Sequence, residues 1–169
     1  LVRESLKKEN VNQGIEICSM SDIPTSGSGL GSSSTFTVCL LHALKQFNKN
    51  ATQPRILADD ACDIEINKCR QPIGKQDQYA ASFGGLNYIQ FNKEIVSVNK
   101  IQVNKSFLNE IEDSLFLVYT GILRESSNIL NAIKTQIKQK NKHEILKEMN
   151  DITNLFKDEI EKENIDFFS

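Results

Sequence analysis

Apolar residues recur at helical spacing along much of the chain. After residue 32, Phe36, Leu40, Leu44 and Phe47 follow one another at steps of four, four and three. That spacing puts all four on one face of a helix, which we expect to run over about 32–47. Similar patterns, interrupted at glycine and proline, predict the other helices. They are expected at residues 1–9, 54–68, 74–85, 107–111, 128–140 and 145–160.

Three stretches favour strands instead. Residues 15–20 alternate apolar and polar side chains, as a strand with one buried face does. Residues 86–91 and 95–98 are rich in β-formers on either side of Asn92-Lys93, which predicts a hairpin that residues 101–103 extend. Residues 114–120 are the last predicted strand, ended by Gly121. The mixture of helices and strands predicts an α+β fold.

Composition excludes several classes of partner. The 169 residues carry a net charge of −2, with 25% charged side chains. Without a basic excess, we expect no nucleic-acid partner and no binding to an anionic membrane. The longest apolar runs, such as 116–119, are far too short to cross a bilayer. The four cysteines show no C-x-x-C spacing, so we expect free thiols in a reducing, cytoplasmic setting.

A segment rich in glycine and serine leads directly into the helix predicted at 32–47. Residues 26–34 hold three glycines and five serines. The first N–H groups of a helix have no partner within it, and glycines let a ligand approach the backbone closely, so the segment suits a phosphate-bearing ligand. No lysine follows the glycines, which excludes a P-loop, and Ser32 stands where a dinucleotide fingerprint needs glycine. A flexible linker with a serine N-cap is the alternative interpretation.

The segment resembles the phosphate loop of the GHMP kinases, a superfamily that includes galactokinase, homoserine kinase and mevalonate kinase. In that family Pro-x-x-x-Gly-Leu-Gly-Ser-Ser opens a helix over the ATP phosphates. Here Pro24 precedes the Gly-Leu-Gly-Ser-Ser run with one extra residue, which leaves the path of residues 25–28 open. The resemblance implies that the following residues bind ATP: Pro24, Gly27, Ser28, Gly29, Leu30, Gly31, Ser32, Ser33 and Ser34.

The same resemblance implies a two-domain α+β architecture. Its N-terminal domain is ribosomal-protein-like with a left-handed βαβ connection, an exception to the usual hand, and its second domain is ferredoxin-like. With a boundary near 104–113, residues 1–103 would be the ATP-binding domain without its first strands. Residues 114–169 would then begin an incomplete second domain. The chain also opens without Met, so we expect a piece of a longer protein, weakly active or inactive by itself.

Two carboxylates are candidates for the chemistry. Mg²⁺ prefers oxygen ligands, and Ser33 and Glu65 are the candidates to hold it. Glu65 lies in an apolar stretch where an unpaired charge is costly. The alternative interpretation is that its carboxylate simply faces solvent from a helix. Asp77 lies between glycines and would otherwise be an N-cap or turn residue. The resemblance implies that Glu65 binds Mg²⁺ and that Asp77 takes or orients the proton of the acceptor hydroxyl.

Thr120 and Arg124 form a third candidate element. A strand that ends in Thr and is followed by Arg resembles a Thr-x-x-x-Arg element near the active site of mevalonate-type enzymes. The resemblance implies a catalytic part for both residues. A strand end with an exposed arginine is the alternative.

The resemblance runs in separated motifs from Ile15 to Arg124. Residues 21–24, 29–38 and 76–87 are most similar to sugar kinases that use ATP to phosphorylate the anomeric hydroxyl of a heptose phosphate, on the route to lipopolysaccharide or capsule. Fucose-, galactose- and mevalonate-type substrates stay open. A non-catalytic nucleotide- or sugar-binding relative and an interaction module with a purely structural loop stay open too. The oligomeric state is not determined by the sequence, and a homodimer is one option.

Overall fold

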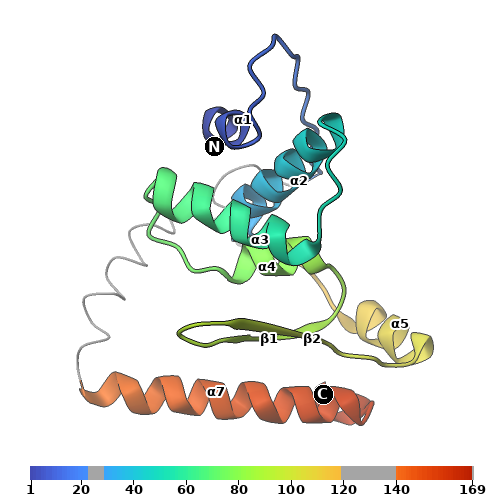
Figure 1. The fold of residues 1–169 in the computed structure, drawn as a ribbon. Helices are drawn as coiled ribbons and strands as arrows, with labels where there is room; N and C mark the ends of the chain where they lie inside the picture. The colour runs from blue at the N-terminus through green and yellow to red at the C-terminus, as the bar shows by residue number, and fades with distance from the viewer. Residues whose placement is uncertain (23–28, 119–139, 169) are drawn as a thin grey trace. The chain divides into compact units, whose positions relative to one another are not determined.

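The computed structural model describes residues 1–22, 29–118 and 140–168. These residues form two compact units, separated in the sequence between Gly84 and Gly85 (Figure 1). The first unit contains α1 (Val2–Lys8), α2 (Ser32–Phe47), α3 (Pro54–Cys62), the π-helix η1 (Asp63–Lys68) and α4 (Gln76–Phe83). The second unit contains β1 (Asn87–Phe91), β2 (Val96–Lys100), α5 (Lys105–Ser114), α7 (Lys140–Glu161) and the 3-10 helix η2 (Ile165–Phe168).

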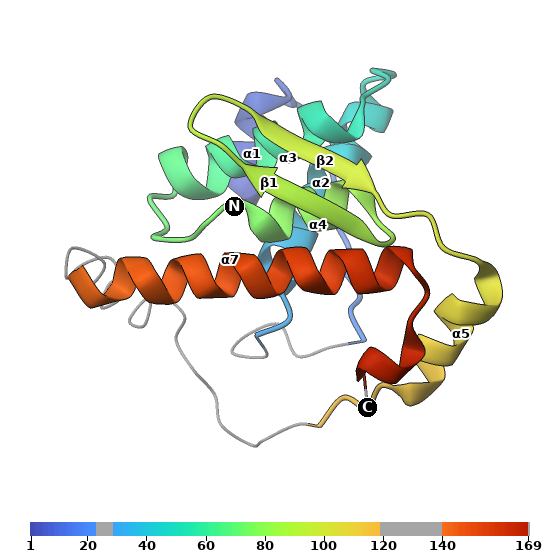
Figure 2. The ribbon, with the colours of Figure 1, turned by 90° about the horizontal axis from the view of Figure 1, so that it is seen from below.

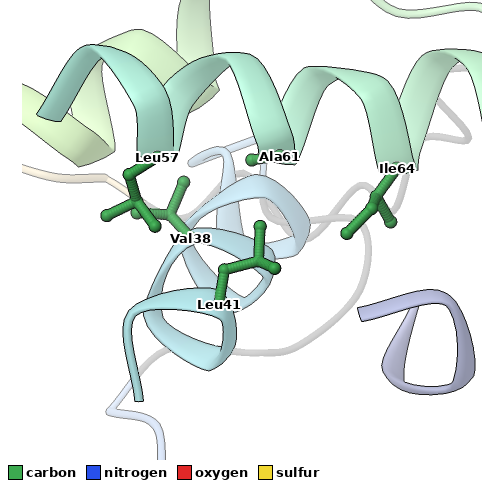
Figure 3. Close-up of a cluster of buried hydrophobic side chains, with 5 residues drawn as sticks. All are labelled: Val38, Leu41, Leu57, Ala61 and Ile64. Atoms are coloured by element: carbon green, nitrogen blue, oxygen red, sulfur yellow. The ribbon is translucent and has the colours of Figure 1, made fainter. Parts of the chain in front are cut away.

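The core of the first unit lies between α2 and the continuous helical stretch of α3 and η1 (Figure 3). Val38 and Leu41 are three residues apart on α2 and therefore share one face. They pack against Leu57, Ala61 and Ile64, which lie about one helical turn apart along the facing stretch. Leu41 and Ile64 are completely buried, and such a side chain stabilises the fold by about 1.5–3 kcal/mol. This packing holds α2 against η1.

The helical stretch changes from the α-helix α3 to the π-helix η1 just before Glu65. α3 begins at Pro54, which suits the first helical position because its missing N–H has no partner to find there. After Cys62 the chain continues as η1, and the N–H of Cys69 donates to the carbonyl of Ile64 at 2.8 Å. π-helical turns are rare and are frequent at functional sites. Glu65 lies in this turn.

Two lysines tie the N-terminal region and α2 to α3. Lys45 Nζ lies 2.8 Å from Glu9 Oε1 and 2.8 Å from Asp60 Oδ2, and Lys8 Nζ lies 3.0 Å from Asp60 Oδ1. Burial lowers the pKa of Lys45, but its hydrogen bonds to Asp60 and Glu9 outweigh that effect and raise the pKa overall. The network is largely shielded, because the Lys45 side chain is only 12% exposed.

The second unit is organised around the antiparallel hairpin of β1 and β2, in which Asn87 lies opposite Lys100. α7 runs along this hairpin (Figures 1 and 2), and the Tyr88 hydroxyl of β1 donates to Asn154 Oδ1 of α7. The buried core residues of the unit are Ile101, Phe107 and Ile160. In neither unit does a described helix have the length and apolar character needed to cross a bilayer.

Most of the predicted helices are confirmed. Helices occupy the predicted stretches at 1–9, 32–47, 54–68 and 74–85. The predicted hairpin forms, but residues 101–103 do not extend it, because β2 ends at Lys100. The short helix expected at 107–111 is the longer α5, and the last predicted helix lies within α7. The helix expected at 128–140 falls outside the described residues except for Lys140, the first residue of α7.

Two predicted strands are wrong in their described parts. Residues 15–20 have no regular structure, and Ser114 ends α5 while residues 115–118 are not in a strand. Alternating side chains are not enough, because a strand also needs a neighbour to take its backbone hydrogen bonds. Within the described ranges, β1 and β2 pair only with each other. The left-handed βαβ connection, the ferredoxin-like second domain and the boundary at 104–113 stay predictions.

Candidate active site

The glycine-rich segment ends in a left-handed turn that starts α2. Gly29 and Gly31 have φ of +72° and +66°, in the region that favours glycine over every other residue. The N–H of Thr35 donates to the carbonyl of Gly31 at 3.0 Å, which closes the first helical turn. Gly31 occupies the N-cap position and has no side chain with which to cap the helix. Backbone N–H groups at such a helix start suit an anion.

The Glu65 carboxylate is completely buried beside the first turn of α2. Ser33 Oγ donates to Glu65 Oε1 at 3.0 Å, and Ser34 Oγ donates to Glu65 Oε2 at 2.7 Å. Hydrogen bonds of this kind offset part of the cost of removing a charge from water. The alternative of a solvent-facing carboxylate is therefore wrong. The structure places the two candidate metal ligands, Ser33 and Glu65, in direct contact.

Two further side chains hold Glu65, and sequence reasoning missed both. Thr37 Oγ1 lies 3.3 Å from Glu65 Oε1, and the Gln78 side-chain amide donates to Glu65 Oε2. Thr37 and Gln78 are both 0% exposed. The one available signal was the position of Thr37, a polar residue one helical turn after Ser33 on an otherwise apolar face. Gln78 gave no such signal.

Asp77 belongs to α4, but its side chain lies beside the start of α2. A Cβ added at Gly31 would lie 3.1 Å from Cγ and 3.2 Å from Oδ2 of Asp77. Asp77 is not an N-cap, because Lys75 occupies that position of α4 and Asp77 lies in the first turn. The carboxylate is half-buried. Asp77 therefore lies beside the N-terminus that would receive a phosphate.

Buried neighbours keep α4 in place. The Tyr79 hydroxyl donates to Asp59 Oδ1 of α3 at 2.5 Å. Burial, followed by this hydrogen bond and the negative charge of Asp59, raises the pKa of Tyr79 to about 12. Burial also raises the pKa of the Cys62 thiol to about 11. Both side chains are therefore held in their neutral forms near neutral pH.

The residues present fit a Mg²⁺ ion that is also held by a nucleotide. Ser33 and Glu65 offer oxygen atoms only, which is the ligand type that Mg²⁺ prefers. Ser33 is exposed, so its hydroxyl can be reached from outside. Over the described part of the chain, no group of three or more His, Cys, Asp or Glu side chains could hold a metal ion by itself. Phosphate oxygens and water would have to complete the coordination.

The structure brings together part of the predicted site and leaves part untested. Gly31, Ser33, Ser34, Glu65 and Asp77 meet around the first turn of α2. Gly29, Leu30 and Ser32 are adjacent to that group in the chain, with Gly29 and Leu30 exposed and Ser32 half-buried. Five predicted site residues lie outside the described residues: Pro24, Gly27, Ser28, Thr120 and Arg124.

A mostly apolar cleft of about 360 Å³ lies elsewhere on the first unit. Its walls come from α2, the start of α3 and the end of α4, and none of the predicted site residues contributes to them. The chemistry-bearing side chains therefore gather at the start of α2, outside this cleft. The lining residues are Thr35, Val38, Cys39, His42, Thr52, Pro54, Leu57, Ala81 and Ser82.

Comparison with known proteins agrees with the geometry. Residues 1–85 match the family model of the GHMP kinases N terminal domain. Over 110 residues the chain is 38% identical to a Campylobacter jejuni protein named D-glycero-alpha-D-manno-heptose 7-phosphate kinase, and this alignment covers 64% of the chain but only 32% of that relative. No solved structure matches the chain. Because the family match spans half of the sequence and includes the glycine turn, Glu65 and Asp77, the chain belongs to the GHMP kinases.

Proposed function

We propose that this chain carries the nucleotide-binding part of an ATP-dependent sugar-phosphate kinase. The reaction would transfer the γ-phosphoryl group of ATP to the anomeric hydroxyl of D-glycero-D-manno-heptose 7-phosphate, giving the 1,7-bisphosphate. The name of the Campylobacter jejuni relative supports a heptose phosphate as the acceptor. The kinase class is supported by the family match.

The single observation that carries the proposal is that two carboxylates flank one helix start. Glu65 is bonded to Ser33 on the inner side of the first turn of α2. The Asp77 side chain occupies the space beside Gly31, the N-cap of the same helix, into which a Cβ at that position would project. Phosphoryl transfer needs the phosphates held in line, their charge neutralised and the attacking hydroxyl oriented. A helix start between two acids supplies a group for each of these tasks.

The proposed mechanism assigns one role to each part. Backbone N–H groups in the first turn of α2 would bind the phosphates of ATP. Asp77 would orient the acceptor hydroxyl and accept its proton as the new oxygen–phosphorus bond forms. At the same time the bond between the γ-phosphorus and the β–γ bridging oxygen breaks, and ADP leaves. Ser33 and Glu65 would hold Mg²⁺, which neutralises negative charge on the phosphates when it is bound.

The remaining predicted residues complete the proposal. Pro24, Gly27, Ser28, Gly29, Leu30, Ser32 and Ser34 would line the nucleotide phosphates with Gly31 and Ser33. Thr120 and Arg124 would contact the transferred group from the other part of the chain. We also propose the two-domain architecture of the family, with residues 1–103 in the ATP-binding domain and 114–169 in the second.

A phosphorylation assay tests the function. The full-length protein that contains this chain is incubated with Mg·ATP and the heptose 7-phosphate, and the product is identified by mass spectrometry and ³¹P NMR as the 1,7-bisphosphate. Asp77→Asn keeps the size of the side chain but removes the proton acceptor, so kcat should fall by about 10²–10⁴-fold while Mg·ATP binding persists. Asp113→Asn is the matched control, because Asp113 is an exposed residue of α5 and should turn over like the unmodified protein.

The outcomes separate the open alternatives. Faster turnover of galactose, fucose or mevalonate would replace the heptose substrate but keep the kinase. Binding of Mg·ATP by the full-length protein without turnover of any acceptor would indicate a non-catalytic relative. The absence of any Mg·ATP binding in calorimetry would contradict the kinase proposal and favour an interaction module.

A further inference from the structure

The side chain of Gln78 turns inward, in the same helical turn that carries Asp77. It is 0% exposed. Its Nε2 donates to Ser34 Oγ at 3.0 Å and also to Glu65 Oε2. A primary amide has two N–H hydrogens, so one amide can make both bonds at once. Gln78 thus connects α4, α2 and η1 at one buried point.

The two oxygens of Glu65 are held unequally. Oε2 accepts from Ser34 Oγ at 2.7 Å and from the Gln78 amide. Oε1 accepts from Ser33 Oγ at 3.0 Å, and its other neighbour, Thr37 Oγ1, is farther away at 3.3 Å. Thr37 has a single hydroxyl hydrogen, and the carbonyl of Ser33 at 3.0 Å competes for it. Oε1, next to the exposed Ser33, is therefore the oxygen that is freer to bind a cation.

Gln78 carries a cost that stability alone does not explain. Its Oε1 is buried and has no hydrogen-bond partner among the described residues. A buried acceptor without a partner costs about 1–3 kcal/mol, whereas an apolar side chain of similar volume would carry no such penalty. What glutamine provides at this position, and an apolar side chain cannot, is the pair of N–H groups directed at Ser34 and Glu65. A buried polar atom without a partner calls for an explanation, and a role in function is one of those known.

We propose that Gln78 is a positioning residue for the divalent cation. By fixing Glu65 Oε2 in the interior, it turns Oε1 toward Ser33 and so sets the affinity of the Ser33–Glu65 pair for the metal. This inference rests on the proposed function, because it presumes a Mg·ATP complex at the start of α2. Partners that orient a metal-binding carboxylate through a hydrogen bond commonly change metal affinity strongly when they are removed.

Substitution of Gln78 by methionine provides the test. Gln78→Met keeps the volume, removes both N–H groups and removes the unpartnered oxygen, so the free energy of unfolding should change little. With Mn²⁺ as the probe in the presence of ATP, electron paramagnetic resonance should show cation binding weakened by about 10- to 100-fold. ATP affinity without a divalent cation should stay the same. Gln76→Met, at an exposed position of the same turn, is the matched control and should bind Mn²⁺ normally.

A double-mutant cycle distinguishes positioning from general support of the fold. If Gln78 acts through Glu65, then Gln78→Met should have no further effect on Mn²⁺ binding in a Glu65→Gln background. Normal Mn²⁺ binding by Gln78→Met, or an equal loss in both backgrounds, would overturn the inference and leave the kinase proposal standing. Failure of the unmodified protein to bind Mn²⁺ and ATP would overturn both. If Gln78→Met does not fold, Gln78→Asn withdraws the amide by one methylene and tests the same contact.

Discussion

The side chain of Asp77 occupies the space that a side chain at Gly31 would need. A Cβ at Gly31 would lie 3.1 Å from Asp77 Cγ and 3.2 Å from Oδ2. Such separations are tighter than ordinary van der Waals contact, so one of the two groups would have to move. The glycine therefore does more than permit the turn, because it also lets a carboxylate from α4 come up to the start of α2.

Gly31→Ala should damage both the fold and the site. The φ of +66° is unfavourable for alanine, and we expect the free energy of unfolding to fall by about 1–2 kcal/mol. The new methyl group would also displace Asp77, so kcat should fall more than stability alone explains. Urea unfolding and steady-state kinetics measure the two effects.

Gly85→Ala is the control for backbone strain. Gly85 has a φ of +73°, and an added Cβ there meets no atom within 4 Å. This variant should lose similar stability while its kcat stays normal. Equal losses of kcat in Gly31→Ala and Gly85→Ala would show that the contact with Asp77 is not what matters.

The ion network around Asp60 should contribute measurably to stability. Asp60 accepts from both Lys8 and Lys45, and its side chain is 18% exposed. Asp60→Asn should lower the free energy of unfolding by about 1–2 kcal/mol, above the range of about 0–1 kcal/mol for exposed pairs. Asp158→Asn, which removes an exposed partner of Lys157, should change it by no more than a few tenths of a kcal/mol. Similar effects in chemical denaturation of the two variants would contradict the role given to the network.

Stability should fall in alkaline solution because two buried acids resist ionisation. The pKa of Cys62 is raised from 9.0 to about 11, and that of Tyr79 from 10.0 to about 12. A pKa that is higher in the folded state gives stability that is complete below the unfolded-state pKa and is lost as the pH rises to the folded-state value. The loss should therefore begin near pH 9 and be complete near pH 12.

Single variants assign that alkaline loss to its sources. Raising the pKa of Cys62 to about 11 or that of Tyr79 to about 12 corresponds to at most about 2–3 kcal/mol of unfolding free energy for each residue. Tyr79→Phe should flatten the dependence of the unfolding free energy on pH in the upper part of this pH range. Cys62→Ala should flatten it in the lower part. A profile that keeps its slope in both variants would mean that other groups are responsible.

The sequence predicted the elements whose ends are determined by residues at those ends. Gly31 and Pro54 mark helix starts through their own backbone preferences, and both helices begin where expected. The strands expected at 15–20 and 114–120 failed because strand formation depends on a partner elsewhere in the chain, which alternation does not report. The π-helical character of η1 was likewise not predictable from an apolar pattern that suits an ordinary helix.

The sequence predicted the two carboxylates of the site, but it did not predict two of the side chains that contact Glu65. Glu65 and Asp77 were identified through the family resemblance, and both lie at the start of α2. Gln78 and Thr37 were missed, because their contacts with Glu65 join residues 13 and 28 positions apart. Such contacts follow from the packing of α2, η1 and α4, which a single sequence does not display.

The most direct test of the account is a titration with Mg·ATP followed by two-dimensional ¹H–¹⁵N NMR. The central claim is that backbone N–H groups at the start of α2 bind the phosphates. The account predicts that the amide resonances of residues 29–34 shift most, and that they still shift in Asp77→Asn, since Asp77 serves the acceptor. Saturating Mg·ATP that leaves these resonances in place, or that shifts only residues elsewhere, would contradict it.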